Sequence, residues 1–217
     1  EPSQAAYAYD LSAARGGWTA LPDVPFLLQY QAFGVDDRSG QLLAFGGQDA
    51  GGEATAELWR LDLDLADQEG AWVRLAPGAE DAWPEPRIGA TLTFVDGAGL
   101  ALLYGGYDPS TGATFGDLWL LDAADPDRPQ WSLLDVAGAP AARSGHSAVW
   151  DAGGRALIVH GGVTVSGTVP TYFGDTWALE LEPQAGTPTG TPTTGTPTTT
   201  EGAIFLPVAA NRFAAAP

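Results

Sequence analysis

The stretch Leu100–Asp122 reads LALLYGGYDPSTGATFGDLWLLD, and its outline recurs at two other places in the chain. In each copy an apolar run ends in two glycines, a polar loop follows, and an acidic residue stands shortly before a tryptophan. The landmarks are Gly46 and Gly47, Gly105 and Gly106, and Gly161 and Gly162, followed by Trp59, Trp119 and Trp177. Both landmarks recur at roughly 60 residues, the period of a supersecondary repeat.

Within each repeat the residue pattern is that of β-strands. The runs before the glycine pairs, such as ALIVH, are short and continuously apolar, as in strands buried on both faces. WRLDL and WALEL alternate apolar and polar residues, which is typical of strands with one wetter face. A second tryptophan, Trp72 or Trp131, follows in the first two repeats. Each repeat therefore predicts a four-stranded antiparallel meander.

These features resemble the kelch repeats of β-propeller proteins, over roughly residues 7–181. The resemblance rests on the diglycine, the spaced acidic residue and tryptophan, the second tryptophan, and the opening RSGHSA of the third repeat. It implies an all-β fold of kelch-like propeller blades, about three and a partial one, followed by a disordered tail. The expected units are 26–86, 87–141 and 142–182, with a partial unit at 5–25.

The two ends of the repeat region depart from the pattern. Residues 7–20 align with the last two strands of a repeat, with Tyr7 at the position of the first tryptophan and Trp18 at that of the second. The third repeat has no second tryptophan after Trp177, so we expect the Trp18 strand to complete its blade. Closed propellers need about four to eight blades. We therefore favour a chain cut from a longer one at its N-terminal side, which implies association with the missing blades. The alternatives are a small open array and assembly with another chain.

The composition excludes several classes of partner. The formal net charge is −18, which opposes binding to nucleic acid and to anionic lipid surfaces. The chain has no cysteine, so disulfides and thiolate metal sites are excluded. No apolar stretch approaches the roughly 18 residues that a membrane span needs.

A low-complexity segment rich in threonine and proline occupies residues 185–202, and a short apolar tail follows at 203–217. Such a linker cannot bury apolar surface and is expected to be extended. The arrangement looks like the C-terminal ends of secreted or surface-exposed bacterial proteins. It predicts an extracellular or bacterial cell-surface location.

Nothing in the sequence predicts catalysis. His146 and His160 are the only candidates for proton chemistry near neutral pH, and both are expected to be structural. Ser144, His146 and Asp151 include the residue types of a hydrolase but lack its arrangement. The copper chemistry of some kelch propellers needs a cysteine-linked cofactor. We expect no catalytic residue, no metal and no cofactor.

Binding is the better-supported function. In kelch proteins partners meet the loops between the second and third strands and those between blades. Here these loops carry aromatic and acidic residues that suit peptides or sugars, namely Asp49, Asp81, Trp83, Tyr107, Asp108, Tyr172 and Phe173. The other interpretation is that these side chains hold their own loops in place.

The resemblance thus implies a non-catalytic binding module of an exported, surface-attached bacterial protein, with protein or glycan as its partner. One alternative is the C-terminal part of a sugar-acting propeller enzyme, mutarotase-like or oxidase-like, with its catalytic residues outside this chain. Another is a set of structural spacer repeats.

Overall fold

The computed structural model describes most of the repeat region and one short C-terminal strand. The described residues are 6–10, 17–21, 23–24, 29–36, 39–62, 71–77, 82–95, 99–180 and 213–215. They form strands and connecting loops, with no helix among them. In particular, they include no helix of the length and apolarity required to cross a membrane. Asp81, the 185–202 linker and the tail apart from Phe213–Ala215 lie outside them.

The first two complete blades are four-stranded antiparallel meanders, as predicted. In each blade the strands hydrogen-bond in the order in which they occur in the chain. The strands of the first blade are β3 (Ala32–Val35), β4 (Gln41–Phe45), β5 (Leu58–Asp62) and β6 (Trp72–Leu75). Those of the second are β7 (Thr91–Val95), β8 (Leu100–Asp108), β9 (Ala113–Asp122) and β10 (Gln130–Leu134).

The third blade takes its fourth strand from far along the chain. Its strands are β11 (Ser147–Asp151), β12 (Ala156–His160), β15 (Thr176–Glu180) and β16 (Phe213–Ala215), in that order across the sheet. The connection between β12 and β15 forms a separate hairpin of β13 (Val163–Ser166) and β14 (Val169–Tyr172). The expectation that the Trp18 strand completes this blade is wrong, because the outer edge of β15 pairs with β16.

The Trp18 strand belongs instead to a two-stranded sheet at the N-terminal end. β1 (Ala6–Asp10) pairs with β2 (Gly17–Leu21), with Tyr9 opposite Trp18. Their rings meet edge to face with centroids 5.1 Å apart. Trp18 is 73% exposed and Tyr7 is 59% exposed, so one face of this half-blade is largely uncovered among the described residues.

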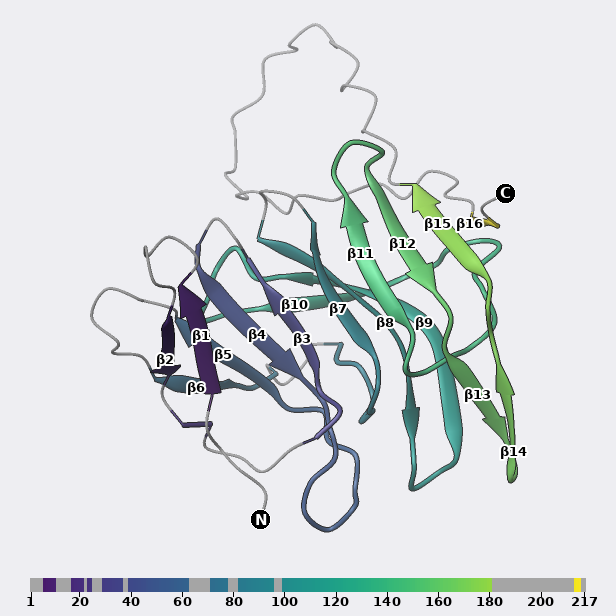
Figure 1. Ribbon diagram of the computed structural model, residues 1–217, viewed down its shortest axis with the longest axis horizontal. Coiled ribbons are helices and arrows are strands. Elements are labelled where there is room, and N and C mark those ends of the chain that lie inside the picture. Colours follow the sequence, from purple (N-terminus) through teal and green to yellow (C-terminus); the bar gives the residue numbers. More distant parts are fainter. Residues whose placement is uncertain are drawn as a thin grey trace, which may run out of the picture.

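The three complete blades pack side by side around their first strands. β7 lies between β3 and β11, so the first strand of each blade is the innermost (Figure 1). The two faces of β8 pack against different blades. Leu103 belongs to the core shared with the first blade, and Leu102 belongs to the core shared with the third. The described residues therefore form two inter-blade cores, and the second blade contributes to both.

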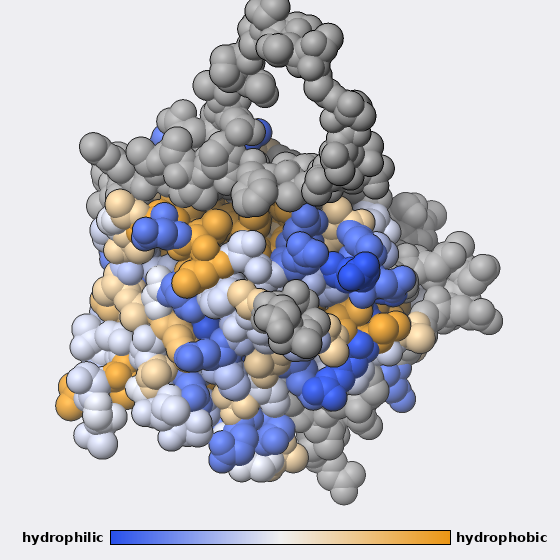
Figure 2. Space-filling model, turned by 180° about the vertical axis from the view of Figure 1, so that it is seen from behind, coloured by the Kyte–Doolittle hydropathy of each residue, from blue (hydrophilic) through white to orange (hydrophobic). Residues whose placement is uncertain are grey.

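The tryptophans contribute to these cores in different ways. Trp119 and Trp131 are buried between the first and second blades, where Trp131 meets Phe45 edge to face at 5.2 Å. Trp177 packs, partly buried, against the core between the second and third blades. Viewed from behind, the surface shows hydrophilic residues in several groups with apolar residues between them (Figure 2).

Candidate functional site

The connections between the second and third strands of all three blades gather at one end of the molecule, the lower end in Figure 1. The residues that lead into the innermost strands lie at the same end, because adjacent strands are antiparallel. We call this end the loop face. It comprises residues 29–31, 46–57, 85–90, 105–116, 143–146 and 161–175.

A buried arginine anchors the loop face of the second blade. Arg87 is 1% exposed, and its two terminal nitrogens bind the two carboxylate oxygens of Asp117 at 2.6 and 3.0 Å. Its Nη1 also donates to the carbonyl of Gly105, and its guanidinium stacks 4.0 Å from the ring of Phe115. Trp119 donates from its indole nitrogen to the same carboxylate. A paired, hydrogen-bonded geometry of this kind is what allows a charge to be buried.

The third blade repeats this arrangement residue for residue. Arg143 is fully buried, binds the carboxylate of Asp175 at 2.7 and 3.1 Å and donates to the carbonyl of Gly161. Its guanidinium lies 4.3 Å from the ring of Phe173. The hydrogen bond from Arg143, the main cause, lowers the pKa of Asp175 to about 2. Both arginines are therefore neutralised within their own blades.

Near the centre of the loop face, backbone hydrogen bonds link the three blades. The amide of Gly89 donates to the carbonyl of Tyr30, and the amide of Gly145 donates to the carbonyl of Gly89. All three residues have positive φ, and Tyr30 is the one that is not glycine, with a φ of 61°. Its side chain is 62% exposed. A bulky residue in this conformation is uncommon and costs about 1–2 kcal/mol.

Two further tyrosines are joined to this central chain by short backbone bridges. Tyr107 exchanges hydrogen bonds with Ile88, the residue before Gly89. Tyr172 pairs with Val163, and Val163 exchanges hydrogen bonds with Ser144, the residue before Gly145. Tyr172 is 77% exposed. The loop face therefore carries Tyr30 and Tyr172 as open aromatic rings and Tyr107 as a half-buried one.

The two predicted loop carboxylates that the structure describes, Asp49 and Asp108, are engaged with their own turns. Asp108 is 7% exposed and accepts hydrogen bonds from the backbone and hydroxyl of Ser110 and from the hydroxyl of Thr111. These hydrogen bonds outweigh the opposing effect of burial, and they lower the pKa of Asp108. Asp49 accepts from the amides of Gly51 and Glu53. Both residues shape loops, as in other Asx turns.

Two of the predicted aromatic residues also serve the scaffold. Trp83 is half-buried against the first core, donates from its indole to the carbonyl of Ala56 and meets Trp131 edge to face at 6.2 Å. Phe173 supports the guanidinium of Arg143. Of the seven predicted binding residues, Tyr172 is the one with a widely exposed ring among those that the structure describes.

Of the two histidines, His146 occupies a packing position, whereas His160 is exposed. His146 is buried, its Nε2 lies 2.9 Å from the hydroxyl of Thr91 in the second blade, and its ring meets Tyr104. Burial, and then the positive charge of Arg143, lower its pKa to about 4. His160 bonds to the hydroxyl of Thr176. Asp151 stands at the far end of β11, so Ser144, His146 and Asp151 do not form a catalytic triad.

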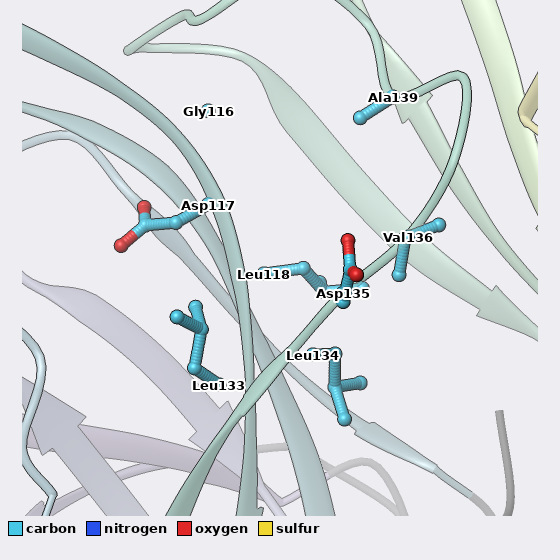
Figure 3. Close-up of a pocket in the computed structure, with 8 residues that line it drawn as sticks. All are labelled: Gly116, Asp117, Leu118, Leu133, Leu134, Asp135, Val136 and Ala139. Carbon is cyan, nitrogen blue, oxygen red and sulfur yellow. The ribbon is translucent and has the colours of Figure 1, made fainter.

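The described residues give little support for a metal site or for a polar small-molecule site. They contain no group of three or more histidine or acidic side chains that could hold a metal ion. A cavity of about 310 Å³ opens between the start of β9 and the end of β10, with Leu118, Leu133 and Leu134 on its wall (Figure 3). Asp117 borders this cavity, but its carboxylate is held by Arg87. The lining is therefore mainly apolar, with Asp135 as its second carboxylate.

The electrostatics of the loop face are acidic. Glu53 and Glu85 are exposed there. Arg87 and Arg143 are buried and paired, and the more exposed Arg74 binds Glu57 at 2.9 Å. Exposed aromatic rings and exposed carboxylates on one face attract cationic groups through the ring quadrupole and through simple charge.

Tyr30 and the two arginines were missed as key residues by sequence reasoning. Arg143 stands in the opening RSGHSA of the third repeat and Arg87 at the same place in the second, but their partners lie some 30 residues away and only packing brings them together. Tyr30 could have been found by aligning the first repeat with the others, since it takes the position of Gly89 and Gly145.

Comparisons with known proteins agree with this architecture. The family model of the KLHDC2/KLHL20/DRC7 Kelch-repeats domain matches residues 7–185. The chain is 33% identical over 144 residues to an F-box/kelch-repeat protein of Arabidopsis thaliana, covering 58% of this chain and 29% of that protein. It is 31% identical over 157 residues to the Adagio-like protein 3 of Oryza sativa subsp. japonica, covering 72% and 22%. The chain thus spans less than a third of the length of these relatives.

Proposed function

This chain belongs to the kelch-repeat family, and we propose that it is a non-catalytic protein-interaction module that binds extended basic peptide segments on its loop face. The observation that carries the proposal is Tyr30. A tyrosine takes the left-handed conformation that the other two blades assign to glycine, and its ring is 62% exposed. Strain of this kind persists mainly at functional positions.

The chemistry of the partner follows from the other exposed residues of the loop face. Tyr172 offers a second open ring, and Glu53 and Glu85 add negative charge without an exposed, unpaired arginine among the described residues of this face. Lysine or arginine side chains of a peptide would stack on the rings and meet the carboxylates. Because the scaffold beneath is held by backbone bonds and buried ion pairs, binding requires little reorganisation.

A selection from a random displayed peptide library against the full chain tests the proposal. We expect enrichment of peptides rich in lysine and arginine, with affinity that falls as ionic strength rises. Tyr30→Ala and Tyr172→Ala should each weaken binding about tenfold, as expected for exposed aromatic anchors. Val149→Ala is the matched control, since Val149 is 59% exposed on β11, outside the loop face.

Other outcomes would favour the other interpretations. Binding to a glycan array with loss in the same two variants would favour a carbohydrate partner. Enriched peptides without basic residues, or binding indifferent to both tyrosines, would refute the proposal. No binding of either kind would favour spacer repeats, whereas turnover of a sugar by a longer protein containing this chain would favour the enzyme.

We also propose an extracellular, surface-attached location. Its support is the sequence of residues 185–202, a threonine- and proline-rich linker before a short apolar segment. Accessibility of an epitope tag in this protein to antibody on intact cells of its source organism tests the proposal, and a tag reached only after lysis would contradict it.

A further inference from the structure

The C-terminal strand β16 sits on the third blade in the same register as the fourth strands of the other blades. In the first blade Leu61 lies opposite Trp72, and in the second Leu121 lies opposite Trp131. In the third, Leu179 lies opposite Phe213. The chain therefore places an aromatic residue at the same position of the ladder in all three blades.

The connections to these fourth strands differ greatly. In the first two blades residues 63–71 and 123–129 are enough to lead from the third strand to the fourth. In the third blade residues 181–212 stand between β15 and β16, and they include the threonine- and proline-rich segment. The entropic penalty of closing a loop grows slowly with its length, so a long connection permits pairing but holds the strand less firmly.

The strand itself is also short. β16 pairs through three residues, whereas β10 pairs with β9 through five. Without it, the outer edge of β15 would present unpaired backbone groups, which proteins normally cover because they attract other strands. Leu179, at one end of the pairing region, is fully buried and belongs to the second core.

We propose that the outer edge of β15 is a strand-binding site, and that the C-terminal segment around Phe213–Ala215 is its resident, detachable occupant. The segment adds to the sheet as an antiparallel strand, with main-chain hydrogen bonds supplying affinity and the aromatic residue opposite Leu179 supplying register. The linker keeps this occupant near its site at an effective concentration on the order of millimolar. The proposal is independent of ligand binding at the loop face.

Amide hydrogen exchange in the full chain tests the assignment. The variant Ala214→Pro with Ala215→Pro removes two backbone donors of β16, of which alternate amides must face β15. Exchange of those β15 amides within Trp177–Leu179 that face β16 should accelerate at least tenfold, while the amides that face β12 and those of β8 in the second blade serve as internal references. The matched control is Ala209→Pro with Ala210→Pro, which has the same composition outside the strand. It should leave β15 protection unchanged.

A peptide in trans then distinguishes a binding site from a merely structural strand. A synthetic peptide of residues 208–217, added at about millimolar concentration, should restore β15 protection in the 214/215 variant. The same peptide with Phe213→Ser should fail to do so. Phe213→Ser in the full chain is the milder variant, should the double proline variant also lose protection in β8.

Three results would overturn the proposal. Unchanged β15 exchange in both 213 and 214/215 variants would remove β16 from this edge. Loss of protection that no peptide restores would make the edge a fixed part of the fold. Protection that rises with protein concentration, together with a dimer in sedimentation, would assign the strand to a neighbouring copy.

Discussion

The first blade and the two that follow it differ in how they stabilise the same corner, the diglycine that follows the apolar run of the second strand. In the second and third blades a buried arginine joins the carboxylate before the tryptophan to a diglycine carbonyl. In the first blade Glu57 receives the indole of Trp59 and the guanidinium of Arg74 from β6, and Arg74 is 61% exposed. The pairing of carboxylate and indole is thus common to all three blades, and the buried arginine is not.

The difference corresponds to the contacts between neighbouring blades, which we call seams. The carbonyl of Arg87 accepts the amide of Gly47 from the first blade, and the carbonyl of Arg143 accepts the amide of Gly106 from the second. Each arginine therefore fixes its own blade with its side chain and the preceding blade with its backbone. No diglycine corner precedes the first blade in the described chain. The buried ion pair therefore occurs in the two blades whose arginine also hydrogen-bonds to the preceding blade.

Removing the carboxylate should produce the largest difference in the free energy of unfolding between the two kinds of corner. Asp117→Ala leaves Arg87 buried without its partner and should lower the free energy of unfolding by about 3–5 kcal/mol. Glu57→Ala removes a pair whose arginine is exposed to solvent and should cost about 1 kcal/mol or less. Denaturant unfolding of both variants measures the difference, and equal losses would show that the buried pair has no special part in the seam.

Glycine substitutions at equivalent corners should isolate the contact between blades. Gly105 and Gly161 have φ values of 66° and 70°, so the conformational penalty of alanine is similar at both. At Gly105 a Cβ would lie 2.4 Å from the carbonyl oxygen of Arg143, whereas at Gly161 its nearest neighbour, the carbonyl oxygen of Phe173, is 3.6 Å away.

Gly105→Ala should therefore destabilise the fold by about 3 kcal/mol, from backbone strain and overpacking together. Gly161→Ala should cost about 1–2 kcal/mol, from strain alone. Thermal or denaturant unfolding measures both. If Gly161→Ala costs as much as Gly105→Ala, then the corner of the third blade is also in close contact with a neighbour.

Stability should depend on pH because of His146, which packs at the seam between the second and third blades. Its pKa in the folded chain is lowered to about 4, while an unfolded histidine titrates near 6.5. Between these values the unfolded state binds more protons, so stability falls as pH drops from 6.5 towards 4 and this contribution then levels off. The loss should approach about 3 kcal/mol.

His146→Ala is the matched variant, because Ala90 stands at the same position in the second blade. It should remove the slope between pH 6.5 and 4 from a series of denaturant unfolding curves. The contribution of Asp175 falls in a separate window, since its lowered pKa means stability that is lost as pH drops from 3.8 through about 2. A slope that persists in His146→Ala between pH 6.5 and 4 would contradict the assignment.

The repeat landmarks predicted the sheets well because diglycines and tryptophans act locally. Gly105 and Gly106 produce a register shift within the pairing of β8 with β9, and their spacing from Trp119 sets the length of the hairpin. The occupant of the last edge could not be predicted in this way, because residues 181–212 interrupt the period before Phe213. Trp18 was assigned to that edge only because its repeat position matched.

The candidate site was predicted less well because aromatic and acidic residues in loops have two uses. Asp108 stands before Pro-Ser-Thr-Gly and Asp49 before Ala-Gly-Gly, both patterns of residues that fold their own turns. Residue type alone could not separate these from free carboxylates. Exposure separates Tyr172 from Phe173, its neighbour in the chain, and exposure depends on where Arg143 lies.

The smallest effect on stability is expected at Tyr30, and it should have the opposite sign to the effect on binding. Tyr30→Gly relieves a left-handed tyrosine, worth about 1–2 kcal/mol, but adds the greater chain entropy of glycine in the unfolded state, about 0.5–1 kcal/mol. The variant should thus be as stable as the parent or up to about 1 kcal/mol more stable, while binding of basic peptides weakens.

Denaturant unfolding and peptide titration of the same preparation test both halves of this expectation. A gain in stability with a loss of binding is the trade expected where strain serves a function. A loss of more than about 1 kcal/mol on Tyr30→Gly would instead mean that the ring packs against the scaffold, as Trp83 does at the neighbouring seam. The first blade would then differ from the others through packing alone, and the loop face would lose its central anchor.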